Sequence, residues 1–287
     1  MKLQALTAAE KRWRALPNHL MAGLAARLPG ASSRFRRALA QAVAAKPSET
    51  FRCAVSFALA ERVLGEAAVI DADPQSIDRW IFSEARSDGR VESPREYFLV
   101  DGPWKSLVRP LDRSRLDREV RELINCGGDY RQTKLFRNLS GRLNDERMFL
   151  RNGVVFRSLE DIEGYCRHHL RLIESIRSHG VVRRSGLARI GASAGRSTPN
   201  AGFLERIETD AGVAVGPTGR LLRYRGGFHR TAAARELGLA SLPVQVKLVH
   251  MNWLRKLVGE TGLSAHEALV VGLKRLSRPA APIGADP

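Results

Sequence analysis

The feature that most constrains the fold is a run of short strand and helix patterns, separated by glycine turns, in the C-terminal half of the chain. The pattern predicts a strand at 211–215, a turn at 216–219, a strand at 220–224, a helix from about Arg230 to Leu237 and a strand from Pro243 to Leu248. Gly226 and Gly227 precede the predicted helix and Gly238 ends it. Because strands and a helix alternate without a repeat, we expect a mixed sheet of the α+β class.

Helical patterns dominate the rest of the chain. Helices are predicted at 7–16, from Ser32 or Ser33 to about Val43, at Phe51–Leu64, Leu111–Leu123, Asp129–Leu143 and Ser158–His179, and one more at Leu263–Leu276. The clearest is Ser158–His179, because Ser158 and Asp161 fit a capping box. Residues 66–110 are broken by Asp, Pro and Gly and predict loops and short elements, among them one short strand near Tyr97.

These patterns predict three parts. We expect a mostly helical region of unknown role at 1–150, a small mixed-sheet domain at 151–260, and a terminal helix with a Pro-, Ala- and Gly-rich tail at 261–287. A Gly- and Ser-rich stretch at 185–203 reads as a loop, either a lid beside a site or a simple connection.

Charge and cysteine usage narrow the class of protein. The chain has 47 Lys and Arg against 30 Asp and Glu, a net charge of +17, which fits a nucleic-acid partner or a biased base composition of the gene equally well. No signal peptide and no apolar run long enough for a membrane span is found, so a cytoplasmic protein is expected. The scattered Cys53, Cys126 and Cys166 predict neither disulfides nor a zinc site, and each is expected to be a buried small hydrophobe.

The glycine turn at 226–227 carries the most specific chemistry. A helix start leaves backbone N–H groups unpaired and has a partial positive charge, and glycines before it let an anion approach closely. His229 and Arg230 add side-chain donors at the same place, a set that suits a phosphate. The alternative is a tight structural turn whose His229 and Arg230 pair with acidic neighbours. His168 and His169 are adjacent on a helix and are expected on its surface rather than at a metal.

The segment Gly226-Gly227-Phe228-His229-Arg230, the Ala-rich helix after it and Leu242-Pro243-Val244 resemble the signature of the ParB/sulfiredoxin superfamily. The helix that ends at Gly180 is similar to the one that precedes the first strand there, so the resemblance covers about residues 156–257. It implies a small mixed-sheet domain that binds a nucleoside triphosphate, ATP or CTP, with Mg²⁺. The implied cofactor-binding residues are Gly226, Gly227, Phe228, His229, Arg230 and Thr231.

The resemblance implies several activities. Sulfiredoxins use a cysteine where this chain has Phe228, so cysteine sulfinic acid reduction is not expected. ParB partition proteins hydrolyse CTP and carry a helical DNA-binding domain after this one, for which a single helix at Leu263–Leu276 is too little. Free-serine kinases of the superfamily transfer a phosphoryl group to a small hydroxyl compound. For such a reaction Glu208, Asp210 and His229 are the catalytic candidates. Glu205, Glu208 and Asp210 are candidates for a base or for Mg²⁺ coordination, and the alternative is that these carboxylates only solvate a loop.

Two further residues come from a similarity to bacterial proteins whose ParB-like domain ends with a His and a Trp, here His250 and Trp253. They are expected to line the pocket of the phosphate site or, for Trp253 above all, to lie in the core. The expected function is nucleotide binding, with phosphotransfer or NTP hydrolysis. Two alternatives stay open: a DNA-associated nucleotide-dependent switch, and a non-catalytic module that binds a ligand or partner.

Overall fold

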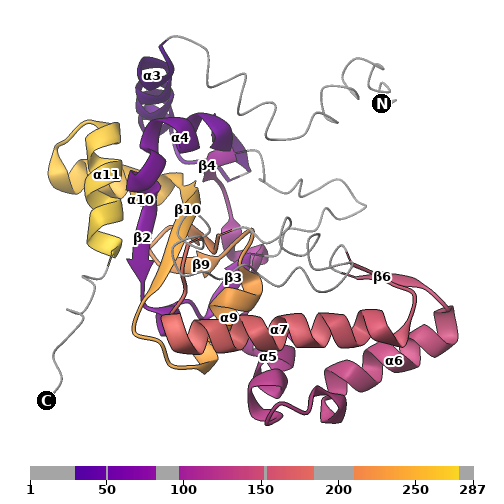
Figure 1. Cartoon of the computed structure of the whole chain (residues 1–287). Helices are drawn as coiled ribbons and strands as arrows, with labels where there is room; N and C mark the ends of the chain where they lie inside the picture. Colours follow the sequence, from indigo (N-terminus) through magenta and orange to yellow (C-terminus); the bar gives the residue numbers. More distant parts are fainter. Residues whose placement is uncertain (1–29, 50, 82–96, 152–153, 184–209, 278–287) are drawn as a thin grey trace, which may run out of the picture.

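The computed structural model describes residues 30–49, 51–81, 97–151, 154–183 and 210–277 (Figure 1). Within these ranges, no helix is both long and apolar enough to cross a membrane. The predicted helix at 7–16, the loop at 185–203, Glu205, Glu208 and the tail lie outside the described residues.

One mixed sheet of eight strands forms the centre of the described structure. Its strands are β1 (Arg52–Ser56), β2 (Val69–Ala72), β3 (Arg79–Ile81), β4 (Tyr97–Asp101), β5 (Val108–Pro110), β8 (Gly212–Val215), β9 (Leu221–Arg223) and β10 (Leu242–His250). The order is β1-β4-β10-β8-β9-β3-β5, and β2 also pairs with β10. β10 is parallel to β4 and β8 and antiparallel to β2. With helices on its surfaces, this sheet confirms the predicted α+β class.

The sheet takes strands from both sides of residue 150, so the expected boundary there does not coincide with an edge of the sheet. Loops and short elements were expected at 66–110, and the short strands β2, β3 and β5 form there; of the strands in this stretch, only the one near Tyr97 was assigned from the sequence. The missed strands have three or four residues. A period of two is not recognisable over so few positions, and their pairing is decided by distant strands.

The predicted helix at Phe51–Leu64 is wrong in its first half. β1 occupies 52–56, and only α4 (Phe57–Leu64) is helical. Val55 is buried and pairs with Leu99 of β4. The hydroxyl of Ser56 accepts a hydrogen bond from the N–H of Leu59 at 3.3 Å, which caps the helix where the strand ends.

The other described helices are α3 (Ala31–Ala44), α5 (Arg115–Asn125), α6 (Lys134–Glu146), α7 (Leu159–His179), α9 (Phe228–Glu236), α10 (Met251–Thr261) and α11 (Ala265–Leu276). The capping box of Ser158 and Asp161 at the start of α7 is confirmed. Two helices follow β10 where one was predicted, because the apolar positions of α10 pack against the sheet core directly after the strand. From the sequence, a single helix was expected after the sheet, which is too little for a helical domain. Because two helices are present, that count was wrong.

Three apolar cores position the sites. The largest lies between one side of the sheet and α3, α4, α10 and α11. A second, smaller one contains Trp104, Leu107 and Leu222 and lies under the segment that joins β4 to β5. The third joins α5, α6, α7 and the hairpin of β6 (Phe149–Arg151) and β7 (Val154–Phe156) to α9. In Figure 1 the first group of helices and the α5–α6–α7 group lie at opposite ends of the molecule.

Candidate functional site

The turn between β9 and α9 has an uncommon backbone conformation. Arg225, Gly226 and Gly227 follow one another with φ angles of +48°, +90° and +58°. This left-handed backbone suits glycine but is strained at a residue with a Cβ, such as Arg225. Gly227 has no room for a side chain, because a Cβ there would lie 2.4 Å from the Cα of Ala211. The turn is thus fixed against the start of β8, and it sets where α9 begins.

The start of α9 offers backbone donors. Gly227 is its N-cap and has no side chain to cap the helix. The first backbone bond of the helix runs from the N–H of Thr231 to the carbonyl of Gly227, at 2.9 Å. The N–H groups that precede Thr231 therefore have no acceptor within the helix. Together with the partial positive charge of a helix start, they favour an anion at this place.

An acidic neighbour is also present. The guanidinium of the buried Arg230 lies 3.6 Å from the Asp210 carboxylate, which in turn lies 3.9 Å from the guanidinium of Arg183. The structure therefore contains the ion pair that the structural interpretation of the turn requires. Asp210, one of the acids proposed from the sequence, thus lies beside two guanidinium groups.

Lys247 is a buried residue of this site that sequence reasoning missed. Its ammonium donates to the backbone carbonyls of Arg225, at 2.8 Å, and of Asp210, at 3.2 Å. It thereby connects the glycine turn to the segment that leads into β8. Burial, and next the charge of Arg225, lower the pKa of Lys247 to about 8. Lys247 alternates with Val246 and Leu248 along the strand, and no local signal distinguishes a covered position of this kind from an open one.

His229, on the first turn of α9, stacks on His169 of α7 with ring centroids 4.0 Å apart and an interplanar angle of 25°. The expected surface position of His168 and His169 is wrong, since both are buried where α7 packs against α9. Neither ring nitrogen of His169 has a hydrogen-bond partner in the part of the chain that the structure describes. Burial, followed by the charges of His229 and His168, lowers the pKa of His169 well below its ordinary value, so the ring is neutral near pH 7.

Phe228 and Thr231 are held by contacts within the fold. The Arg223 guanidinium lies over the Phe228 ring, 5.1 Å from its centroid, and 2.8 Å from the carboxylate of Asp117 on α5. The hydroxyl of the buried Thr231 donates to the carbonyl of Gly227 at 3.1 Å. The contacts of Arg223 anchor α9 to β9 and α5. The hydrogen bond of Thr231 holds the first turn of α9.

Only one of the acids expected to bind Mg²⁺, Asp210, lies within the described residues. Among these residues, no three His, Cys, Asp or Glu side chains gather closely enough to hold a metal ion. The other expected acids, Glu205 and Glu208, lie outside the described residues.

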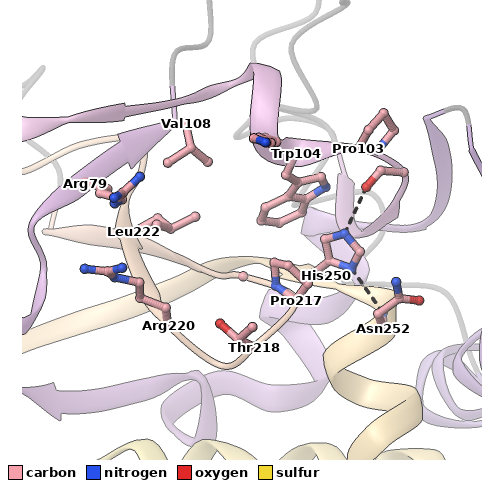
Figure 2. Close-up of a pocket in the computed structure, with 13 residues that line it drawn as sticks. Arg79, Pro103, Trp104, Val108, Pro217, Thr218, Arg220, Leu222, His250 and Asn252 are labelled. Carbon is pink, nitrogen blue, oxygen red and sulfur yellow. Dashed lines mark hydrogen bonds between the residues drawn. The ribbon is translucent and has the colours of Figure 1, made fainter.

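A separate pocket lies at the other end of the β8–β9 hairpin, with a volume of about 530 Å³ (Figure 2). Trp104 and the buried His250 form part of its wall, with ring centroids 4.8 Å apart. His250 Nε2 lies 3.0 Å from the carbonyl of Gly102, and Nδ1 accepts from the N–H of Asn252 at 3.1 Å. His250 was expected to line the pocket of the phosphate site and instead lines this separate pocket, and Trp253 lies in the core.

Gly102 is itself held in place. Its N–H donates to the buried Asp101 carboxylate at 3.0 Å, and the guanidinium of Arg255 on α10 lies 2.9 Å from the same carboxylate. A connected series of hydrogen bonds from α10 through Asp101 and Gly102 therefore fixes the His250 ring. Both ring nitrogens are engaged, so His250 acts here as a rigid wall.

No protein-family model, no curated protein and no solved structure matches this chain. The resemblance to the ParB/sulfiredoxin superfamily therefore rests on the residues of the glycine turn and on the elements around it.

Proposed function

We propose that this protein binds a nucleoside triphosphate through its phosphate groups, at the start of α9. The observation that carries the proposal is the strained turn at 225–227, which places the first N–H groups of α9, those without an acceptor within the helix, beside several cations. Strained backbone persists where the surrounding structure enforces it, and such places cluster at ligand sites.

The charges around the turn favour a ligand with a phosphate group over a ligand with a single carboxylate group. Arg183, Arg230 and Lys247 are three cations at or beside it. The two guanidinium groups lie beside the Asp210 carboxylate, Arg183 also pairs with Glu66, and the Lys247 ammonium donates to the backbone carbonyl of Asp210. A phosphate at the helix start would add negative charge where positive charge is in excess, in a partly buried environment that strengthens the attraction.

The histidine pair supplies a side-chain donor beside the backbone N–H groups. His169 stacks behind His229 and restricts its ring, so the orientation of His229 is set before a ligand arrives. A pre-oriented donor loses little conformational freedom on binding. His229 is therefore the side chain that we expect to contact the phosphate.

Of the described residues at this site, Asp210 would supply one carboxylate ligand to Mg²⁺. Mg²⁺ in phosphate sites is commonly held by one or two carboxylates together with the phosphates and water. The nucleotide's own phosphates would supply most of the remaining ligands. The bound ion would neutralise phosphate charge, and this chain's residues would position the phosphates. Phosphoryl transfer or hydrolysis is the activity that such positioning allows, with Asp210 as the carboxylate beside Arg230.

The proposal is tested by calorimetry of the full chain with ATP, CTP, GTP and ADP in the presence of Mg²⁺. Wild type is compared with a variant that carries Arg183→Ala and His229→Ala. We expect a nucleotide to bind wild type, and the double variant to bind it at least about tenfold more weakly, a change of roughly 1.4 kcal/mol or more.

Arg177→Ala is the matched control, because Arg177 is an exposed arginine on α7 whose ion pair among the described residues is with Glu174 of the same helix. It removes the same charge at a distance from the turn and should leave the affinity unchanged. The proposal fails if wild type binds none of these nucleotides, or if the double variant binds as tightly as the control. Phosphate release by wild type and by Asp210→Asn then measures whether turnover follows binding.

A further inference from the structure

The pocket of Figure 2 lies where three parallel strands end. Gly102 follows β4, Gly216 follows β8, and His250 is the last residue of β10. The carboxyl ends of parallel strands, where neighbouring connections diverge, are the usual place for a ligand in open sheets that contain them. The glycine turn packs against the opposite end of β8, so the pocket is a separate place on the molecule.

The wall of the pocket is apolar and rigid on one side. The buried Trp104 indole packs against His250, and Leu222 and Val108 lie beside it. Burial is the main cause that lowers the pKa of His250, so the ring is neutral at pH 7 and adds no charge. A planar aromatic wall of this kind favours a flat ring in the ligand.

The charged residues that line the pocket are all cations. Arg79, Lys105 and Arg220 line it, and no Asp or Glu does among the described residues. Asp78 pairs with Arg220 at the edge. Within the described ranges, neither Arg79 nor Lys105 takes part in an ion pair. Figure 2 shows the guanidinium groups of Arg79 and Arg220 toward the same end of the pocket. Like charges that converge in this way are stabilised by an anion between them.

We infer that this pocket binds a small organic anion, with a flat ring against Trp104 and a phosphate or carboxylate group held by Arg79, Lys105 and Arg220. The volume of about 530 Å³ suits such a compound, since ligand pockets commonly range from about 300 to 1,000 Å³. The inference does not depend on the proposed function, because the glycine turn contributes no residue to this pocket.

Calorimetry of the full chain with four probes tests the inference: phenyl phosphate, benzoate, inorganic phosphate and benzyl alcohol. We expect phenyl phosphate or benzoate to bind, and the one that binds more tightly identifies the acidic group. Inorganic phosphate lacks the ring and benzyl alcohol lacks the charge, so each should bind at least about tenfold more weakly than the better of the two.

The site is assigned with a variant that carries Arg79→Gln and Lys105→Gln, both exposed side chains whose loss should leave the fold intact. It should weaken binding of the better probe at least about tenfold. Arg118→Gln, an exposed arginine of α5 away from the pocket, is the control and should bind as wild type does. The Arg183→Ala, His229→Ala variant should also bind this probe normally, which separates the two sites.

Three results would overturn the inference. The first is that neither phenyl phosphate nor benzoate binds wild type at millimolar concentration. The second is that the Arg79→Gln, Lys105→Gln variant binds as tightly as Arg118→Gln. The third is that inorganic phosphate binds as tightly as phenyl phosphate, since the Trp104 wall would then play no part.

Discussion

Lys247 illustrates how a single buried residue can control the stability of the turn. Its ammonium joins the carbonyls of Arg225 and Asp210, but burial lowers its pKa from 10.5 to about 8. The unfolded chain keeps the ordinary pKa and therefore binds more protons than the folded chain between pH 8 and 10.5. Since a proton bound preferentially to the unfolded state destabilises the fold, the free energy of unfolding should rise with pH in this window.

We expect wild type to gain about 1 kcal/mol of stability relative to Lys247→Met between pH 8 and pH 9. Urea unfolding of both proteins at the two pH values measures the difference. Burial raises the pKa of Cys166 to about 12, which gives the opposite trend at higher pH, but both proteins contain Cys166 and its effect cancels. Parallel stability profiles for the two proteins would mean that Lys247 titrates normally.

Residues such as Lys247 and His169 mark the limit of prediction at this scale. Their residue types and local spacing are those of exposed positions, and each is buried only because another element covers it. By contrast, the glycines at 226–227 were recognised because their requirement for left-handed backbone is local. The cysteines follow the same rule: Cys166 is buried as expected, whereas Cys53 is exposed on the outermost strand β1, so that expectation was wrong for it.

At the scale of elements, helices α10 and α11 pack closely through Gly272. A Cβ at Gly272 would lie 2.3 Å from a methyl carbon of Leu257 and 3.0 Å from the Trp253 ring. Gly259, on α10, has no atom within 4 Å of the same position. The two glycines thus have the same helix propensity and different surroundings.

Gly272→Ala should lower the free energy of unfolding by about 1–2 kcal/mol, because overpacking outweighs the gain in helix propensity. Gly259→Ala should raise it by about 0.5–1 kcal/mol, because propensity acts alone there. Chemical denaturation of both variants beside wild type measures the two changes. If Gly272→Ala were as stabilising as Gly259→Ala, the close packing of the two helices would be wrong.

Elements with a strong local signal were predicted well. The capping box of α7 lies within one segment and was read directly, as was the glycine that ends α9. The prediction was wrong for β1, because its residues are compatible with a helix and become a strand through pairing with β4. Local propensity is a weak constraint wherever such tertiary pairing is available.

At the scale of the whole molecule, the sheet unites parts of the chain that are far apart in sequence. β10 is covered on its two sides by β8 and β4, and β2 pairs with its first residues. The α+β class was predicted from the helical patterns of the first half together with the alternation at 211–248. The order of the strands did not, because it depends on contacts between the two halves of the chain that no local pattern contains.

This arrangement predicts that residues 151–287 do not fold alone. Without the first half, β10 loses β2 and β4, β9 loses β3, and α9 loses its contacts with α5. An exposed strand edge and uncovered apolar faces would remain, and buried apolar area is the main stabilising contribution to a domain. Thermal unfolding of this fragment, followed by circular dichroism, should show no cooperative transition, whereas the full chain should show one. Adding a separately produced fragment of residues 1–150 should restore the transition, since it supplies the missing strands. A cooperative transition of 151–287 by itself would show that the second half is an independent domain, and that the strands of the first half only extend its sheet.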